Sequence, residues 1–135
     1  MITHVTGPPN LLLGAYDIVS AGYSADEFFV SGTATSYVGG DPADFTTRIV
    51  VLKPTDPARY SGTALVEWLN VSGGIDAPAV WFMAHREVLR AGHAYVAVSV
   101  QSVGVQGGTS FAGFDMSLKS QDAARYSALH HPGDE

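Results

Sequence analysis

Two apolar runs, separated by a glycine turn and an amphipathic segment, occupy the middle of the chain. Residues 63–70 form a nearly continuous apolar run, as in a parallel-sheet strand that is buried on both faces. Residues 72–74 break this run, and residues 77–91 then follow the helical period, with the apolar stripe Val80, Met83, Ala84, Val88 and Ala91. Gly92 is suited to cap that helix, and residues 94–100 form a second apolar run. This order predicts one βαβ unit with a right-handed crossover.

The part of the chain before this unit predicts two antiparallel strands. Residues 27–32 and 46–52 are rich in β-forming residues, and a turn region at 39–42 lies between them. Lys53-Pro54 is expected to stop the second strand. Residues 1–22 carry turn signals without a sustained period, so we expect a leader that lies over a surface. The predicted fold class is α/β, with antiparallel leading strands followed by a βαβ unit of a mostly parallel sheet.

Charge and composition exclude several classes of function. Seven Lys+Arg against thirteen Asp+Glu, with no basic cluster, disfavour nucleic acid or an anionic membrane as a partner. The absence of cysteine from the sequence excludes a disulfide scaffold, a thiolate zinc site and a cysteine nucleophile. No segment approaches the roughly 20 apolar residues of a membrane helix, and the N-terminus does not resemble a signal peptide. We therefore expect a cytoplasmic protein.

The turn Asn70-Val71-Ser72-Gly73-Gly74 lies between a predicted buried strand and a predicted helix. Glycines there let backbone N–H groups point into the space above the sheet, beside the positive end of the helix. Such a turn can bind phosphate, but neither G-x-G-x-x-G nor the Walker pattern is present, and no cofactor is predicted. It can also donate an N–H group to an oxyanion. The alternative is an ordinary tight turn between a strand and a helix.

A second glycine-rich stretch follows the strand predicted at 94–100. It has four glycines between residues 104 and 113 and no clear period before Leu118. It leaves the carboxyl end of a parallel strand, and ligands of open α/β sheets bind at that edge.

A nucleophilic serine on a strand-to-helix elbow needs the pattern G-x-S-x-G, and no serine of this sequence has it. Residues 108–112 come closest, around Ser110, but no buried strand leads directly into them. Ser110 is therefore interpreted as a serine of a flexible loop.

The five histidines do not predict a metal site. His85 is interpreted as a solvated residue opposite the apolar stripe, His93 as a strand-end residue, and His4 as part of the leader. His130-His131 with Asp134 and Glu135 has suitable ligand types, but adjacent histidines point in different directions and a terminal carboxylate cluster is usually solvated.

Glu67 lies inside a predicted buried strand, where an uncompensated carboxylate would cost several kcal/mol. It either pairs with a cation or lies near the strand end where a site opens. A structural role, as a buried ion pair or a hydrogen-bonded carboxylate, is the favoured interpretation.

Several short motifs follow one another from about Gly22 to the last residue. They are Glu27-Phe28-Phe29-Val30-Ser31-Gly32-Thr33-Ala34, Thr46-Thr47-Arg48, Val66-Glu67-Trp68-Leu69-Asn70-Val71-Ser72-Gly73-Gly74, Ala84-His85, Ser99-Val100-Gln101, Arg125-Tyr126 and His131-Pro132-Gly133-Asp134. As an ordered set they resemble the amino-terminal part of the α/β-hydrolase-domain family, whose members are longer chains.

The resemblance implies a serine hydrolase that acts on a small-molecule substrate with an ester-like bond. The loop after Asn70 corresponds to the oxyanion loop of the family, so the backbone N–H of Val71 or Ser72 is the implied donor. The residues implied to bind substrate are Asn70, Gly73, Gly74, Gly104 and Gly107. The serine, acid and histidine of the family lie downstream of the His-Pro-Gly-Asp motif, so none of them can be assigned in this chain.

We therefore expect residues 1–135 to form one partial domain that lacks the nucleophile elbow and is inactive alone. The rival interpretation is a complete small α/β domain that binds a ligand or a partner without catalysis. The two differ at residues 63–70. A partial domain leaves this strand without a neighbour on one side and exposes an apolar patch, whereas a complete domain buries its last parallel strand on both faces.

Overall fold

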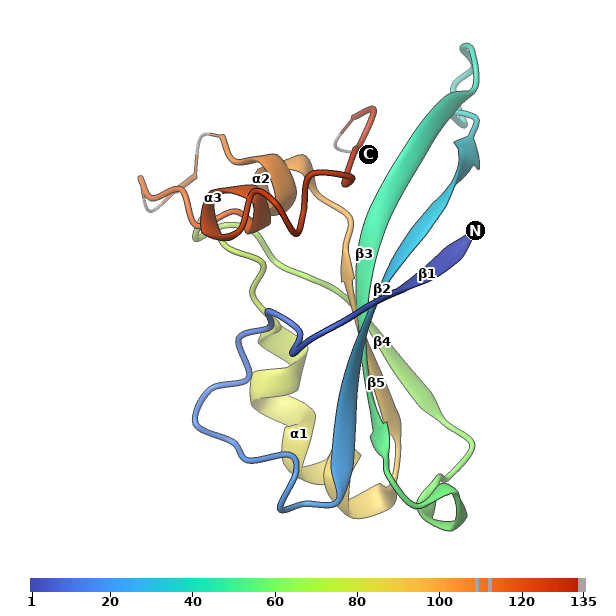
Figure 1. Ribbon diagram of the computed structural model, residues 1–135, viewed down its shortest axis with the longest axis vertical. Helices are drawn as coiled ribbons and strands as arrows, with labels where there is room; N and C mark the ends of the chain where they lie inside the picture. Colours follow the sequence, from blue (N-terminus) through green and yellow to red (C-terminus); the bar gives the residue numbers. More distant parts are fainter. Residues whose placement is uncertain (109, 112, 134–135) are drawn as a thin grey trace.

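The computed structural model describes residues 1–108, 110–111 and 113–133 and contains a mixed five-stranded sheet (Figure 1). The strand order is β1-β2-β3-β5-β4. The elements are β1 (Ile2–Val5), β2 (Tyr23–Ala34), β3 (Ala43–Pro54), a 3-10 turn (Pro57–Arg59), β4 (Ala64–Trp68), α1 (Ala79–Ala91), β5 (Ala94–Ser99), α2 (Ser102–Gln106) and α3 (Leu118–Gln121). No described helix is long and apolar enough to cross a membrane.

The predicted βαβ unit and the α/β fold class are confirmed. β4 and β5 pair in parallel, and α1 connects them, while β3 pairs with β5 antiparallel. Gly92 caps α1 in the left-handed conformation, with φ of +73°. A side chain is also excluded there, because a Cβ would lie 2.0 Å from the Arg59 carbonyl oxygen.

The leading strands are longer than predicted. β2 and β3 have 12 residues each and pair along their whole length, so residues 27–32 and 46–52 are only the apolar centre of each strand. β3 ends at Pro54, so Lys53-Pro54 stops the strand as predicted, although both residues belong to it and Pro54 pairs with Tyr23. The hairpin satisfies its backbone groups by pairing, which extends both strands into polar sequence that carries no periodic signal.

The leader also differs from its prediction in one part. Ile2–Val5 forms β1, which pairs antiparallel with β2. Four residues are too few to show an alternating pattern, and the free edge of β2 supplies the hydrogen-bond partners. The rest of the leader lies over the core as expected, with Leu11, Leu13 and Ile18 packed against it.

β4 is an edge strand in the described structure, because its one neighbour is β5. The prediction that residues 63–70 are buried on both faces is therefore wrong. Val66 and Trp68 are 64% and 57% exposed, whereas Glu67 points to the covered side and is buried. Figure 1 shows the reason: α1 lies against one face of the sheet, and none of the described helices covers the other face.

The main core lies between α1 and the sheet. Trp81, Val88 and Leu89 of α1 are buried there, together with residues of β2, β3 and β5. The predicted stripe of α1 is thus partly wrong, since Met83 is 79% exposed. The large ring of Trp81 is fully buried, whereas Val80 beside it is only partly buried. The face of α1 that packs on the sheet is therefore the one that carries Trp81.

A smaller core forms next to the carboxyl ends of β4 and β5. Its buried members are Val105, Leu118, Tyr126 and Leu129. The glycine-rich stretch that showed no period contains the five-residue helix α2, and Figure 1 shows α2 and α3 together on the same side of the sheet as α1, above that helix. A helix this short has too few turns to produce a periodic pattern, and packing against α3 stabilises it.

Candidate functional site

The glycine turn connects β4 to α1 at the carboxyl end of the parallel pair, as the sequence predicted. Asn70 and Ala77 close the loop through two backbone hydrogen bonds, with N···O distances of 3.0 and 2.8 Å. Within it, the Gly74 N–H donates to the Val71 carbonyl at 2.9 Å, which forms a tight turn. The loop is therefore fixed at its base and at its tip.

The two N–H groups implied as oxyanion donors are not equivalent. The Ser72 N–H donates to Oδ1 of Asn70 at 3.0 Å, so that donor is already occupied. Among the described residues, the Val71 N–H has no acceptor. Asn70 therefore organises the turn through its side chain and leaves Val71 as the available donor.

Residues 110–111 and 113–116 lie directly against this turn. The Phe111 N–H donates to the Ser72 carbonyl at 3.1 Å, and the Met116 N–H donates to the Gly74 carbonyl at 3.0 Å. Ser110 donates its hydroxyl hydrogen to the Phe114 carbonyl at 2.8 Å, which agrees with its interpretation as a loop serine. The two glycine-rich stretches are thus joined by hydrogen bonds between their backbones.

Gly74 is the position where the turn depends on glycine. Its φ is +75°, and a Cβ would lie 2.2 Å from the Phe114 carbonyl oxygen. Gly62 has a similar φ of +84°, but a Cβ there would meet nothing within 4 Å, so it isolates the cost of the backbone conformation. We expect Gly74→Ala to lower the free energy of unfolding by about 1–3 kcal/mol more than Gly62→Ala, measured by urea unfolding. Equal losses in the two variants would contradict close packing of Ser110 and Phe114 on the turn.

Gly104 and Gly107 occupy tightly packed positions beside the turn. Gly104 is buried in α2, and a Cβ there would lie 2.0 Å from Oδ1 of Asp76 and 2.8 Å from Cγ1 of Val71. Gly107 follows α2 with φ of +85°, and a Cβ would lie 2.6 Å from the Asp115 carboxylate. Because Gly104 has no side chain, α2 can pack closely against Val71. Contact of Gly104 or Gly107 with substrate stays a prediction.

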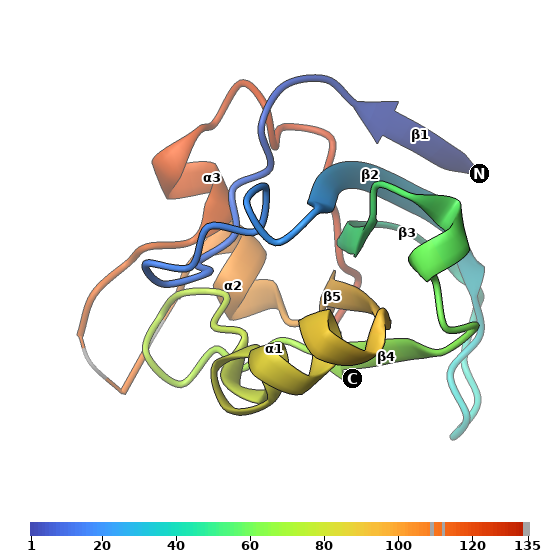
Figure 2. The same ribbon diagram turned by 90° about the horizontal axis from the view of Figure 1, so that it is seen from below.

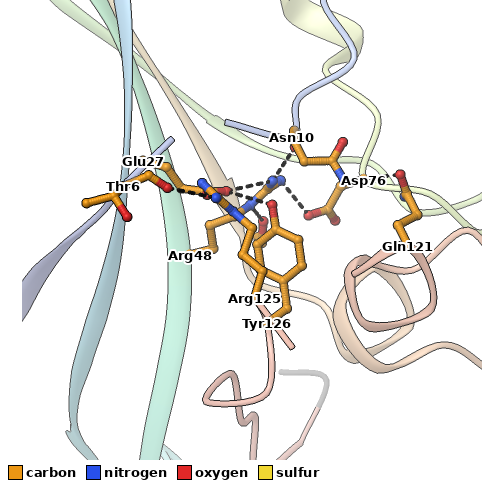
Figure 3. A network of polar contacts seen from close by, with 9 residues as sticks. Thr6, Asn10, Glu27, Arg48, Asp76, Gln121, Arg125 and Tyr126 are labelled. Carbon is orange, nitrogen blue, oxygen red and sulfur yellow. Dashed lines mark hydrogen bonds and ion pairs between the residues drawn. The ribbon is translucent and has the colours of Figure 1, made fainter. Parts of the chain in front are cut away.

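A buried polar network lies beneath the turn and centres on Arg48 (Figure 3). The guanidinium of Arg48 is fully buried and contacts Oε1 of Glu27 at 3.3 Å and Oδ2 of Asp76 at 3.1 Å. It also donates to Oγ of Ser99 at 2.8 Å and to the Asn10 carbonyl. Arg48 thus connects β2, β3, β5 and the leader to the end of the glycine loop.

The carboxyl-terminal part of the described chain joins the same network through Glu27. Arg125 donates to Oε2 of Glu27 from Nε at 2.8 Å and to the Thr6 carbonyl at 2.8 Å. The Tyr126 hydroxyl donates to Oε1 of Glu27 at 3.1 Å. Two guanidinium groups and two carboxylates therefore balance their charges in the interior, as buried charges require.

Sequence reasoning did not assign roles to Arg48, Asp76 and Arg125, although two of them fall in the motifs of the resemblance. The one available signal was Arg48 itself, a charged residue within the apolar run of residues 46–52. Its partners could not be read from the sequence, because they lie 21 and 28 residues away.

Asp76 is the titratable group closest to the turn with a shifted pKa. Burial raises the pKa of its carboxyl above the ordinary value of 3.8, and the Arg48 guanidinium opposes that shift. A raised pKa means that the folded state binds the proton more tightly. The stabilising contribution of Asp76 is therefore complete below about pH 3.8 and is lost as the pH rises through the folded-state pKa.

Because the pKa of Asp76 is raised, we make a pH-dependent prediction for Asp76→Asn. The stability of the variant relative to wild type should increase as the pH rises from about 3.8, because only the wild type loses the contribution. Asp115→Asn is the control of opposite sign, since hydrogen bonds from Ser117 lower the pKa of Asp115. Its relative stability should fall as the pH rises toward about 3.8 and change little above that value. Urea unfolding at several pH values measures both, and parallel trends would contradict the assignment.

Glu67 is a hydrogen-bonded carboxylate, in agreement with its favoured interpretation. Its Oε1 accepts from the Val80 N–H at 2.8 Å, and its Oε2 accepts from the Trp81 N–H at 3.1 Å and from the Tyr95 hydroxyl. The N-cap residue of α1, Pro78, makes no side-chain cap of its own. Glu67 therefore caps α1 from the neighbouring strand, and its negative charge lies at the positive end of the helix.

The described histidines do not form a metal centre. His85 is half-buried rather than solvated, because the Tyr16 ring of the leader covers it at a centroid distance of 4.7 Å. His93 lies just before β5 and contacts Oγ of Ser61 at 2.7 Å, as expected for a strand-end residue. Across residues 1–108, 110–111 and 113–133, no three His, Asp or Glu side chains gather as metal ligands. Asp134 and Glu135 lie outside the described residues.

Two cavities lie at opposite ends of the sheet. The larger, of about 610 Å³, is near the end of β3 and the start of β5, next to Pro54 and Ala94. The smaller, of about 210 Å³, adjoins the glycine turn through Ile75 and Asp76. Because ligands of open α/β sheets bind at the carboxyl ends of the strands, the smaller cavity is the better candidate for the functional site.

The parallel β4–β5 pair, its crossover helix and the antiparallel leading strands define an α/β protein (Figure 2). A family model described as an alpha/beta hydrolase domain matches residues 3–135. The chain therefore belongs to the alpha/beta hydrolase domain family. Comparisons with curated proteins and with solved structures found no match.

Proposed function

We propose that this chain is the amino-terminal part of a serine hydrolase that cleaves an ester-like bond, and that it supplies the oxyanion loop and part of the substrate pocket. The observation that carries the proposal is the glycine turn at the carboxyl end of β4, with the Val71 N–H free of any acceptor among the described residues. Membership of the alpha/beta hydrolase domain family supports the reaction class.

The turn has the properties that an oxyanion donor needs. Its N–H groups are held by the Asn70–Ala77 hydrogen bonds and by Asn70 Oδ1, so the donor is oriented before substrate binds. A preorganised N–H costs no reorganisation when negative charge develops on the carbonyl oxygen. We propose Val71 as the donor, and we assign Ser72 the structural role that its bond to Asn70 supports.

The nucleophile, acid and histidine of this enzyme are proposed to come from sequence that follows Glu135. The free edge of β4 supports this arrangement, because a further strand can pair there, and a helix packed on the uncovered face of the sheet would bury Val66 and Trp68. In the complete site, serine attacks the substrate carbonyl and histidine accepts the serine proton and later gives it to the leaving alcohol. The Val71 N–H donates to the oxyanion of the tetrahedral intermediate.

The experiment compares two proline substitutions in the longer protein, because proline removes a backbone N–H. We expect Val71→Pro to lower kcat for p-nitrophenyl butanoate by about 10²–10³-fold, and Ser72→Pro to lower it much less. Circular dichroism and thermal unfolding establish that both variants fold. A larger loss for Ser72→Pro would transfer the donor role to Ser72, and equal retention of activity would overturn the oxyanion assignment.

The 135-residue chain provides an independent test. We expect it not to hydrolyse p-nitrophenyl esters by itself, since none of its serines lies on an elbow. Turnover that Ser110→Ala abolishes would contradict the proposal. A monodisperse, monomeric chain with a cooperative thermal transition would favour the rival interpretation, a complete small binding domain.

A further inference from the structure

Asp76, near the end of the glycine loop, attaches that loop to the buried network. Its side chain is 4% exposed, and its Oδ2 contacts the Arg48 guanidinium at 3.1 Å. Arg48 is held in turn by Ser99 of β5, by Glu27 of β2 and by the Asn10 carbonyl of the leader. Figure 3 shows Glu27, Asn10 and Asp76 gathered around this guanidinium. The position of the Asp76 carboxylate is therefore set by segments outside its own loop.

Two short routes lead from Asp76 to the Val71 N–H. Along the backbone, Asp76 precedes Ala77, and the two hydrogen bonds between Ala77 and Asn70 reach the residue before Val71. Through side chains, Asp76 and Val71 pack against the same glycine of α2. A Cβ on Gly104 would lie 2.0 Å from Oδ1 of Asp76 and 2.8 Å from Cγ1 of Val71. Because closely packed groups transmit small displacements, a shift of the Asp76 carboxylate would move Val71.

Stability alone does not account for this buried ion pair. Replacing a buried ion pair with well-packed apolar residues is often neutral or stabilising, because both charges lose their hydration on burial. Burial raises the pKa of the Asp76 carboxyl although Arg48 opposes the shift, so the guanidinium does not fully offset this cost. The pair does supply a fixed geometry, since a guanidinium presents its donors in a rigid planar fork. Such a constraint is useful next to a catalytic group that must be held within about 0.5 Å.

We infer that Arg48 is a positioning residue that holds the Val71 N–H in place for the oxyanion through Asp76. The inference rests on the proposed function, in which Val71 is the donor. Because Arg48 is fully buried, it acts through Asp76 and does not touch substrate. The oxyanion develops in the transition state and not in the bound ester, so a displaced donor weakens binding of the transition state alone. Loss of the positioning should therefore lower kcat and leave KM unchanged.

The test uses an arginine-to-lysine variant of the longer protein. Lysine keeps the positive charge, but one ammonium group cannot replace the fork that contacts Glu27, Asp76 and the Asn10 carbonyl together. We expect Arg48→Lys to lower kcat for p-nitrophenyl butanoate by about tenfold, with KM within about twofold of the wild type. Kinetics are measured well below the unfolding temperature of each variant, which circular dichroism establishes.

Arg125→Lys is the matched control. Arg125 bonds to Glu27 and to the Thr6 carbonyl in the same network, and among the described residues it makes no hydrogen bond to the glycine loop. This variant should also lose stability, but its kcat should stay within about threefold of the wild type. Equal losses of kcat in the two lysine variants would overturn the inference, because a general weakening of the network would then be sufficient to explain both.

A double-mutant cycle separates positioning of the donor from other effects of Arg48. Proline at residue 71 leaves no N–H to position, so Arg48→Lys should lower kcat much less in the Val71→Pro background than in the wild type. The same tenfold loss in both backgrounds would overturn the inference. Asp76→Asn keeps the size of its side chain and removes the charge, and we expect its effect on kcat to depend on Val71 in the same way, including where Arg48→Lys does not fold.

The single variant Val71→Pro tests the proposed function separately. If it lowers kcat while the cycle is additive, the inference fails and the proposed function stands. If it leaves kcat unchanged, the oxyanion assignment fails and the inference fails with it.

Discussion

Replacing Arg48 with alanine is expected to lower the free energy of unfolding by about 3–5 kcal/mol. The substitution leaves Oδ2 of Asp76 and one oxygen of Glu27 without their guanidinium partner in a fully buried setting. It also removes the donor to the Asn10 carbonyl, so the leader loses an attachment near the glycine turn. Urea unfolding followed by circular dichroism measures the change, and NMR should show altered amide shifts at residues 10 and 76.

Arg90→Ala is the matched control for this prediction. Arg90 also pairs with a carboxylate, Oε1 of Glu87, but both side chains are exposed on α1. Exposed pairs of this kind contribute at most about 1 kcal/mol, so the control variant should lose little stability. Similar losses in the two variants would show that burial of Arg48 does not determine its contribution.

Trp81→Ala is the second substitution with a large expected effect, a loss of about 3–5 kcal/mol. The Trp81 ring is fully buried between α1 and the sheet, with its centroid 5.1 Å from that of Tyr95. Its Nε1 also donates to the Leu13 carbonyl at 3.3 Å, which attaches the leader to α1. The variant therefore combines a cavity in the core with loss of a contact to the leader. Thermal and urea unfolding measure the change.

Met83→Ala is the control for Trp81→Ala, because Met83 lies two residues further along α1 and is mostly exposed. Its free energy of unfolding should stay within about 0.5 kcal/mol of the wild type. If Trp81→Ala were as mild as this control, the face that α1 buries would differ from the one described.

The βαβ unit could be predicted because its signals are local. An apolar run, a glycine turn, a helical period and a capping glycine each depend on neighbouring residues. The existence of β1 could not be predicted in this way, and the free edge of β4 is expected from the partial domain that the resemblance implies and not from its local pattern. Both depend on which strand has a neighbour in space, and four residues of Ile2–Val5 carry too little pattern to show it.

The candidate site likewise has parts that local sequence predicts and parts that depend on the folded structure. The glycine turn is recognisable from its sequence, but the difference between Val71 and Ser72 depends on where the Asn70 side chain turns. Glu67 stands out in the sequence as a carboxylate that needs partners, and the structure supplies them from the first turn of α1. The Arg48 network could not be predicted, because its residues are separated by long stretches of chain.

The hydrogen bonds that Glu27 accepts also bear on the order in which the chain can fold. Arg125 bonds to Glu27 across 98 residues and to Thr6 across 119 residues. Contacts this distant in sequence form slowly, since the entropy of closing the loop is lost before they add any stability. During synthesis, Glu27 and Arg48 leave the ribosome long before Arg125. Oε2 of Glu27 must therefore stay hydrated in the nascent sheet until Arg125 is made and donates to it.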